Sequence, residues 1–356
     1  MTHEFKEIIA SYQKASQKGI RAVIATVVDI DGSSYRRPGV GMLILENGQM
    51  TGAVSGGCVE KEVLRQSQSV FITGKAKMMT YNGRYRLGCE GILYILIEPF
   101  SISSDTISIV QQYLASRKPF EIKSYYSKDE ESDCLMGSTV SFEETHEFRF
   151  SDNFEVSALK QDTALDCFDR DMQPCFRLVI IGSEHDAKQL STIANATGWE
   201  VEVVNTPKSP KMLSDFPGAS KVLNQSPENL VIDRVDKQTA IILMTHNFAK
   251  DLLYLQAIKD TQPIYIGLLG PSRRREKLLC AIIEYSPDVT DEFMECIHGP
   301  AGLNLGAETP QEIAISIIAE ILSVVRDQQP IPLQDKVGGI HGNAQKETVD
   351  SIVNNR

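Results

Sequence analysis

A chain of 356 residues is longer than one hydrophobic core usually organises, so two domains are expected. Hydrophobic residues make up 42% and charged residues 23%, which is typical of a globular protein and excludes fibrous and disordered classes. Lys and Arg number 36 against 47 Asp and Glu, and the net charge of -11 disfavours nucleic acid and anionic membranes as partners.

Apolar runs in the sequence are too short for a membrane helix. The longest, at 240–244 and 92–97, have the length of strands, whereas a spanning helix needs ~20 residues. Acidic and basic residues precede any apolar run at the N-terminus, unlike in a signal peptide, so the sequence predicts a cytoplasmic protein. The seven cysteines are an odd number and no two lie closer than eight residues, so neither a disulfide framework nor an iron–sulfur cluster is indicated.

The first part of the chain predicts an α/β domain with mixed strands. Hydrophobic periodicity alternates between the helical and the strand pattern, and glycines mark the turns. The pattern weakens at 150–175, where we place the domain boundary. The expected elements are a helix near 5–12, strands at 22–28, 42–45 and 50–54, a helix at 59–72, a strand at 92–97, and one helix with a pair of strands within 105–148.

From residue 176 onward, strands and helices alternate. Such alternation predicts parallel strands with crossover helices, so a Rossmann-like parallel-sheet domain is expected. A last helix should begin after Glu308, where Thr309 and Glu312 form a capping box. The expected strands are at 178–181, 201–204, 240–244 and 264–268, with helices at 184–197 and 251–258. The expected organisation is an N-terminal domain at 1–170, the Rossmann-like domain at 171–330 and a polar tail at 331–356.

The string SGGC, from Ser55 to Cys58, stands where a strand gives way to a helix. Two glycines let backbone N–H groups approach a ligand, and the helix N-terminus adds partial positive charge. A cysteine in the first helical turn has a lowered thiol pKa, so Cys58 is a candidate nucleophile or metal ligand. The string also fits a tight turn followed by a small core residue. Arg36 and Arg37 are either solvated charges or, together with this turn, a grip for a phosphate.

The turn after the strand at 178–181 shares only its first glycine with a dinucleotide-binding turn. Gly182 ends the strand, but Glu184 places a negative charge where the pyrophosphate of a dinucleotide would approach. Asn205 stands where an acid would hold the ribose hydroxyls. Tight binding of NAD is therefore not expected.

Two further strand ends carry candidate ligand contacts. His246 follows the strand at 240–244, and Gly270, Ser272 and Arg273 follow the next strand. Ligands bind at the carboxyl edge of an open α/β sheet, where these two ends should be neighbours. A histidine in that place is also often a hydrogen-bonded structural residue, and an arginine run at a helix start is often a solvated surface.

Taken together and in order, several strings resemble the xanthine dehydrogenase accessory factor family of the XdhC and CoxI type. The resemblance covers roughly 5–100 and 176–326, and the set is far more specific than any one string. The sequence departs from the usual family pattern at Glu184 and Asn205. The strings are GSSYRRPG, VSGGCVE, LGCEG with LIEP, MTHNFAKDL, GLLGPSRRREK and GPAGLNLGAETPQEIAISIIAEI.

This resemblance implies a chaperone that binds molybdenum cofactor (molybdopterin) as a ligand, supports its sulfuration and delivers it to a molybdenum hydroxylase such as xanthine dehydrogenase. It further implies a cysteine desulfurase as sulfur donor and a homodimer. Molybdopterin carries a phosphate and a dithiolene-bound metal, so a thiol and nearby arginines suit its two ends. The expected cofactor contacts are Arg36, Ser55, Gly56, Gly57, Cys58, Cys89, His246, Gly270, Ser272 and Arg273, with Cys58 as the metal ligand.

Two other classes of function stay open at this point. The Rossmann-like half could serve an NAD-dependent oxidoreductase, and the whole chain could be a partner-docking adaptor without a cofactor. A complete xanthine dehydrogenase is not expected, because these cysteine spacings leave no place for its iron–sulfur modules.

Overall fold

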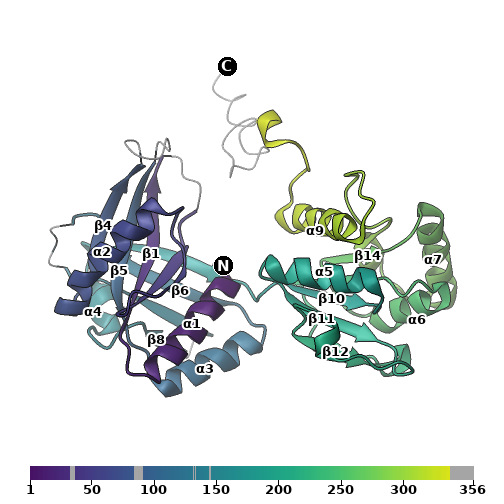
Figure 1. Ribbon diagram of the computed structural model, residues 1–356, viewed down its shortest axis with the longest axis horizontal. Helices are drawn as coiled ribbons and strands as arrows, with labels where there is room; N and C mark the ends of the chain where they lie inside the picture. Colours follow the sequence, from purple (N-terminus) through teal and green to yellow (C-terminus); the bar gives the residue numbers. More distant parts are fainter. Residues whose placement is uncertain (33–36, 84–90, 131, 133, 144–145, 337–356) are drawn as a thin grey trace. The chain divides into compact units, whose positions relative to one another are not determined.

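The computed structural model describes residues 1–32, 37–83, 91–130, 132, 134–143 and 146–336, without the side chain of Cys58. The chain divides into two compact units, Met1–Pro174 and Cys175–Arg356 (Figure 1). We call them the first and the second unit and describe each by itself. Antiparallel sheets in the first unit and a parallel sheet in the second confirm the predicted α/β fold class.

Two antiparallel sheets form the frame of the first unit. The larger has the strand order β3-β2-β1-β5-β4 and the smaller has the order β8-β7-β6-β9. The strands are β1 Ala22–Asp31, β2 Gly41–Leu45, β3 Met50–Gly52, β4 Lys77–Asn82, β5 Ile92–Phe100, β6 Phe120–Tyr126, β7 Gly137–Phe142, β8 His146–Arg149 and β9 Asp166–Met172, and the helices are α1 Thr2–Ser16, α2 Cys58–Thr73, α3 Ser104–Ala115 and α4 Val156–Gln161.

Alternation of side chains along β1 divides the core of the first unit into two layers. Val23 and Val27 point to one face of the larger sheet and pack with Val59 of α2. Ile24 points to the other face and packs with α1, α3 and the smaller sheet. The apolar run at the start of the chain therefore forms a central strand that is buried on both sides.

The predicted helix, strand and hairpin at the start of the chain are confirmed, whereas β4, β8 and β9 escaped prediction. Strand β9 pairs with β6 at an edge of the smaller sheet, and most of its side chains are exposed. Backbone hydrogen bonds rather than apolar side chains hold such an edge strand, so its sequence carries no hydrophobic pattern. The polar segment at 150–175 thus holds α4 and β9 of the first unit up to Pro174.

A six-stranded sheet forms the centre of the second unit. Its order is β12-β11-β10-β13-β14-β15, and all its described pairings are parallel. Numbered within the unit, this is the order 3-2-1-4-5-6 of dinucleotide-binding folds. The strands are β10 Arg177–Ile181, β11 Glu200–Asn205, β12 Lys221–Asn224, β13 Thr239–Leu243, β14 Tyr265–Leu268 and β15 Ile297–His298.

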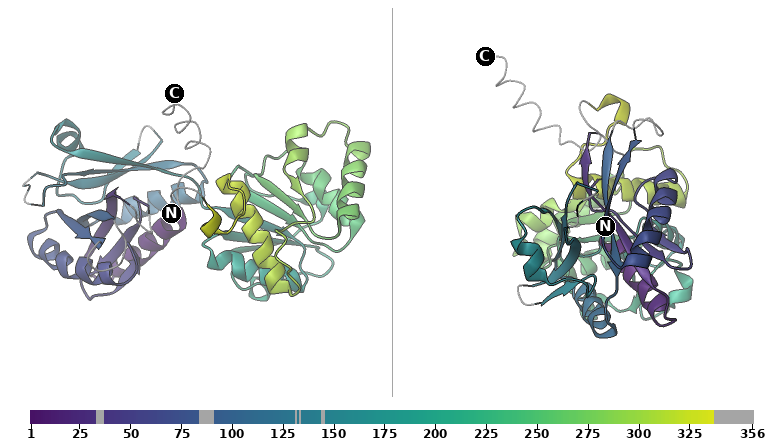
Figure 2. Two further views of the ribbon diagram at one scale, coloured as in Figure 1. Left: turned by 90° about the horizontal axis from the view of Figure 1, so that it is seen from above. Right: turned by 90° about the vertical axis from the view of Figure 1, so that its left-hand side faces the viewer.

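Helices cover both faces of this parallel sheet (Figure 2). Helices α5 (His185–Ala196) and α9 (Pro310–Arg326) pack on one face. Helices α6 (Phe248–Ile258), α7 (Ser272–Tyr285) and the short α8 (Asp291–Glu295) pack on the other. The chain therefore leaves β10 toward one face and β13 toward the other, and the point between these two strands is where ligands bind in such sheets.

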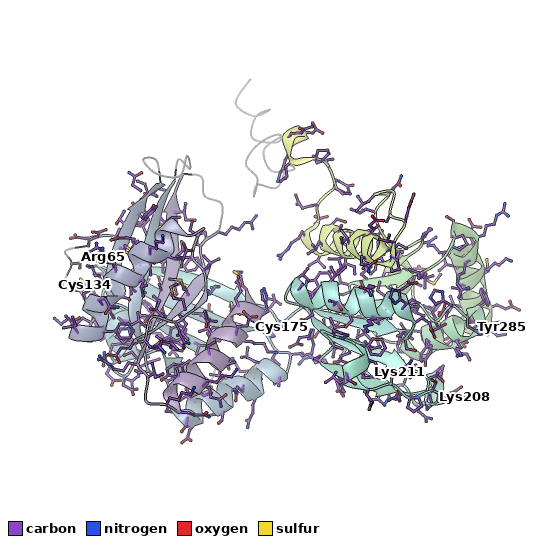
Figure 3. All side chains as sticks on the ribbon, in the orientation of Figure 1. Arg65, Cys134, Cys175, Lys208, Lys211 and Tyr285 are labelled. Atoms are coloured by element: carbon purple, nitrogen blue, oxygen red, sulfur yellow. The ribbon has the colours of Figure 1, made fainter. Side chains whose placement is uncertain are left out.

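No helix of the described part of the chain is long and apolar enough to cross a membrane. The five cysteines whose side chains are described form no disulfide there, and Cys134 and Cys175 lie far apart in the sequence, in the first unit and at the start of the second (Figure 3). Thiol chemistry in the described residues is thus available without reduction of a disulfide.

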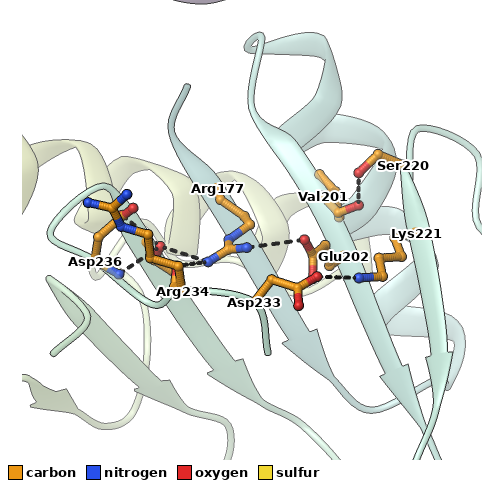
Figure 4. A network of polar contacts seen from close by, with 9 residues as sticks. Arg177, Val201, Glu202, Ser220, Lys221, Asp233, Arg234 and Asp236 are labelled. Atoms are coloured by element: carbon orange, nitrogen blue, oxygen red, sulfur yellow. Dashed lines mark hydrogen bonds and ion pairs between the residues drawn. The ribbon is translucent and has the colours of Figure 1, made fainter. Parts of the chain in front are cut away.

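A buried ion pair fixes the amino-terminal edge of the parallel sheet (Figure 4). The side chain of Arg177, which opens β10, is 2% exposed and lies 3.2 Å from Glu202 of β11. Arg177 also donates a hydrogen bond of 2.5 Å to the carbonyl of Arg234. Beside this buried pair, the exposed side chains of Lys221 and Asp233 form a second ion pair, with 2.8 Å between nitrogen and oxygen (Figure 4). Strands β10 and β11 are thereby tied at the end opposite to the ligand-binding edge.

Arg177→Met should destabilise the protein by about 3 kcal/mol, because it leaves the carboxylate of Glu202 buried without its cation. Lys221→Met should cost no more than about 1 kcal/mol, because that pair is exposed to solvent. Urea unfolding of the two variants and wild type measures both values. Equal losses of unfolding free energy in the two variants would contradict the larger contribution that we expect from the buried pair.

Glu98 of β5 is a carboxyl group buried between the two sheets of the first unit. Its side chain accepts hydrogen bonds from the N–H of Ser138 at 2.8 Å and from the Ser138 hydroxyl at 2.5 Å. Burial disfavours the charged form and raises the pKa of Glu98 to about 7, although the Ser138 hydrogen bonds and Arg170 oppose the change. The folded protein therefore keeps this proton nearly up to neutral pH.

Glu98→Gln should remove a pH dependence of stability. From about pH 4.5 to pH 7 folded wild type holds a proton that the unfolded chain has released, so its free energy of unfolding falls as the pH rises. The variant has no such proton, and its free energy of unfolding relative to wild type should rise by up to about 3 kcal/mol between pH 5 and pH 8. Urea unfolding at both pH values measures the difference; parallel profiles would contradict the assignment.

Candidate functional site

The SGGC turn connects the end of the β2–β3 hairpin to α2. Val54 before it is buried, and α2 begins at Cys58, as the sequence predicts. Gly57 has a φ of +95°, a left-handed conformation that favours glycine. No described atom lies within 4 Å of a Cβ built on Gly56 or Gly57, so the turn borders open space. The backbone thus places Cys58 at the first position of a 16-residue helix.

The carboxylate of Glu60 closes this turn from inside. One oxygen accepts the N–H of Ser55 at 2.7 Å, and the other accepts the N–H of Gly57 at 2.5 Å. Glu60 is 8% exposed, so these bonds are shielded from water. We expected the amides of this turn to face a ligand; two of them are bound to the chain's own carboxylate instead, which corrects that expectation.

Three of the expected contacts have side chains that the structure does not describe. Arg36 and Cys89 lie outside the described residues, as does the side chain of Cys58. The loop that contains Arg36 ends at a fixed point, because Arg170 of β9 donates a hydrogen bond to the carbonyl of Gly39. Burial lowers the pKa of Arg170 to about 10, so it stays a cation at neutral pH.

In the second unit, acidic groups border the point between β10 and β13. Gly182 ends β10, and a Cβ there would lie 2.4 Å from the carbonyl oxygen of Met244, so the two strand ends approach closely. Glu184, exposed, precedes α5. His246 has a left-handed φ of +55°, and its Nε2 lies 3.6 Å from a carboxylate oxygen of Asp186 in the first turn of α5. These carboxylates disfavour a diphosphate at the N-terminus of α5.

The end of β11 carries the neutral amide of Asn205 where dinucleotide-binding folds hold the ribose with a carboxylate. Asn205 is buried, and its side-chain amide donates to the carbonyl of Ser209 at 2.6 Å and to the side chain of Asn224 at 2.9 Å. The amide is therefore used within the loop after β11. Weak binding of NAD therefore stays a prediction.

A buried carboxylate links the ends of β13 and β14. Asp251 of α6 is 2% exposed, and one of its oxygens accepts the hydroxyl of Thr245 at 2.5 Å. Its other oxygen accepts Arg274 of α7 at 2.6 Å. Gly270 has a φ of +116° and leaves room for the Arg274 side chain. A Cβ at position 270 would lie 2.8 Å from the Cδ of Arg274. The two candidate strand ends are thus neighbours held in a fixed relation.

Between the first turns of α6 and α7 lies an open pocket of about 500 Å³. Because Arg274 is paired with Asp251, its charge is offset. The side chain of Arg275 donates to the carbonyl of Ile297 and packs along Gly299. Of the three arginines, Arg273 therefore remains as an exposed cation of the pocket. The pocket is lined by Phe248, Pro271, Arg273, Arg274 and Lys277.

The structure gathers only some of the expected residues. Gly270, Ser272 and Arg273 belong to one turn at the pocket, whereas His246 contacts Asp186 of α5. Sequence reasoning missed Phe248 and Lys277 at the pocket and Glu60 at the SGGC turn. Glu60 could have been predicted from one feature of the sequence: it follows Gly57 by three residues, which is the spacing of a capping box.

Within the described residues, no three His, Cys, Asp or Glu side chains form a group that could hold a metal ion. The expectation that Cys58 is a metal ligand concerns a side chain outside the description.

Two parts of the chain match known protein families. Residues 15–82 match the XdhC and CoxI family, and residues 178–321 match the XdhC Rossmann domain. The first range includes the SGGC turn with Glu60, and the second includes every strand of the parallel sheet except the first residue of β10.

Relatives extend the similarity over most of the chain. A Bacillus subtilis protein described as a probable subunit of xanthine dehydrogenase is 27% identical over 333 residues, 85% of this chain and 92% of the relative. The molybdenum cofactor insertion chaperone PaoD of Escherichia coli is 24% identical over 336 residues, 92% of this chain and 91% of the relative. Both similarities therefore span the two units.

A solved structure shares the fold of the chain. It is described as a xanthine dehydrogenase from Bacillus halodurans and superposes with a TM-score of 0.73 at 24% identity, covering 92% of this chain and 98% of that one. With part of each unit matched to a model of this family and the fold shared over 92% of the chain, this chain belongs to the XdhC and CoxI family.

Proposed function

We propose that the chain is a maturation factor that binds molybdenum cofactor as cargo and passes it to a molybdenum hydroxylase. The observation that carries the proposal is the SGGC turn, which sets a cysteine at the start of a helix beside open space, in a chain related to an insertion chaperone. Sulfuration of the cofactor, with a cysteine desulfurase as sulfur donor, belongs to the same proposal. The chain acts as a carrier, and the client performs the catalysis.

The first unit supplies the contact for the metal end of the cofactor. Thiolates are soft ligands that suit a molybdenum centre with dithiolene sulfur. Partial positive charge at the N-terminus of α2 favours the thiolate form of a cysteine in its first turn, and the carboxylate of Glu60 offsets part of that charge. Gly56 and Gly57 have no side chains that could obstruct the approach of a bulky metal centre to the turn.

Taken by itself, the second unit has a pocket between α6 and α7 that suits an anion, and we assign a phosphate group to it. Arg273 and Lys277 line it, and Arg274 is held in place by Asp251. The first turns of α6 and α7 add partial positive charge on both sides. Phe248 offers an aromatic edge or face, which suits a phosphate that is attached to a flat ring system. Ser272, in the first turn of α7, is a further hydroxyl donor.

The alternatives differ from this proposal in what they require of the second unit. An NAD-dependent oxidoreductase needs a diphosphate at α5, where Glu184 and Asp186 stand, and a ribose contact, where the Asn205 amide is already bonded. A cofactor-free adaptor would use the arginines of α7 as a partner surface. Binding of a phosphate-bearing pterin is the property that neither alternative has.

Cys58→Ser should lower the affinity for molybdenum cofactor at least about ten-fold, because a hydroxyl is a poor ligand for a soft metal centre. Cys280→Ser is the control, since Cys280 is an exposed thiol on α7 of the second unit. Both variants and wild type are titrated with cofactor under anaerobic conditions, and bound molybdenum is counted. Wild-type affinity and wild-type client activation by Cys58→Ser would remove this residue from the proposal.

The double variant Arg273→Ala/Lys277→Ala should bind the cofactor about ten-fold more weakly, because charge-assisted bonds to phosphate are lost. A charge-matched control is Lys208→Ala/Lys211→Ala, in the loop after β11 (Figure 3). Calorimetry with cofactor, and with NAD as a second ligand, gives the constants. Equal losses in both double variants would point to net charge alone, and micromolar affinity of wild type for NAD would favour the oxidoreductase.

A further inference from the structure

The buried carboxylate of Glu60 has more than the role of a helix cap. An ordinary capping glutamate is present in the same chain: Glu312 of α9 accepts the N–H groups of Glu308 and Thr309, both at 2.9 Å, and is exposed to solvent. Glu60 is 8% exposed and reaches back five residues to Ser55. Burial of a carboxylate is costly unless it is fully hydrogen-bonded, so this arrangement calls for a reason beyond capping.

Amides of a glycine turn before a helix form a place where phosphate groups commonly bind in proteins. In the SGGC turn, the N–H groups of Ser55 and Gly57 point to one side and donate hydrogen bonds to the two carboxylate oxygens of Glu60. The carboxylate thus occupies the position that an anionic ligand would take. Its negative charge also repels a phosphate that approaches the same amides.

We infer that Glu60 is an internal anion that determines what the SGGC turn accepts. It positions Cys58 by fixing the left-handed Gly57, and it excludes phosphate from the turn. A ligand with a metal–sulfur end and a phosphate end is therefore bound here by the metal–sulfur end. This inference rests on the proposed function for the identity of the cargo, but the exclusion of phosphate does not.

The first measurement tests the exclusion without the cofactor. Inorganic phosphate is titrated into isotope-labelled protein, and the amide resonances of Ser55 and Gly57 are followed. Wild type should show no shift at these amides, whereas Glu60→Ala should gain saturable shifts at millimolar phosphate. The matched control Glu312→Ala, which opens the cap of α9, should leave the Ser55 and Gly57 amides silent. Saturable shifts in wild type, or their absence in Glu60→Ala, would overturn the inference.

The second measurement tests positioning. Glu60→Ala should bind molybdenum cofactor at least ten-fold more weakly than wild type, and Glu60→Gln, which keeps an acceptor oxygen, should recover part of that affinity. Glu312→Ala, which opens the exposed cap of α9, should keep its cofactor affinity. An equal loss of affinity in Glu312→Ala, or wild-type affinity in Glu60→Ala, would reduce Glu60 to a cap. If wild type binds no cofactor, the proposed function fails, and the phosphate titration alone decides on Glu60.

Discussion

The hydrogen bonds from Ser55 and Gly57 to Glu60 hold the one abrupt change of backbone direction on which the first unit's candidate site depends. Without a left-handed residue at position 57 the chain could not leave the hairpin and start α2 at Cys58. Helix α2 in turn covers a face of the larger sheet through Val59 and its neighbours. The backbone position of Cys58 and the packing of the unit therefore depend on the same turn.

A comparable constraint operates in the second unit, where strand order decides which groups meet. The order 3-2-1-4-5-6 creates a binding edge, and this chain has filled the usual nucleotide position with carboxylates. Positive charge instead collects one strand further along, between α6 and α7. Asp251 maintains that distribution by pairing Arg274 and holding Thr245 at the same time. A familiar scaffold thus presents a different charge pattern at its edge.

Sequence reasoning succeeded where a local signal decides the outcome. Alternation of apolar strands and helices gave the parallel sheet, and the Thr309 and Glu312 pair gave the start of α9. It failed for β9, whose exposed polar residues are held by pairing to β6, a contact distant in sequence. The partners of Arg274 and Arg275 could not be predicted either. A run of arginines has the same sequence whether its side chains are solvated or bonded, as here, to Asp251 and to the carbonyl of Ile297. Burial of individual charges depends on tertiary contacts that no short string encodes.

The proposed function requires that the folded chain carries a pterin. Wild-type protein should be purified without oxygen from cells that make molybdenum cofactor, then oxidised, and its released pterin and molybdenum quantified against protein. We expect a phosphate-bearing oxidised pterin and molybdenum in equal amounts, approaching one of each per chain. Protein free of both, isolated from cells in which a client molybdenum hydroxylase becomes active only when this chain is present, would contradict the proposed function and favour an adaptor that acts without holding the cofactor.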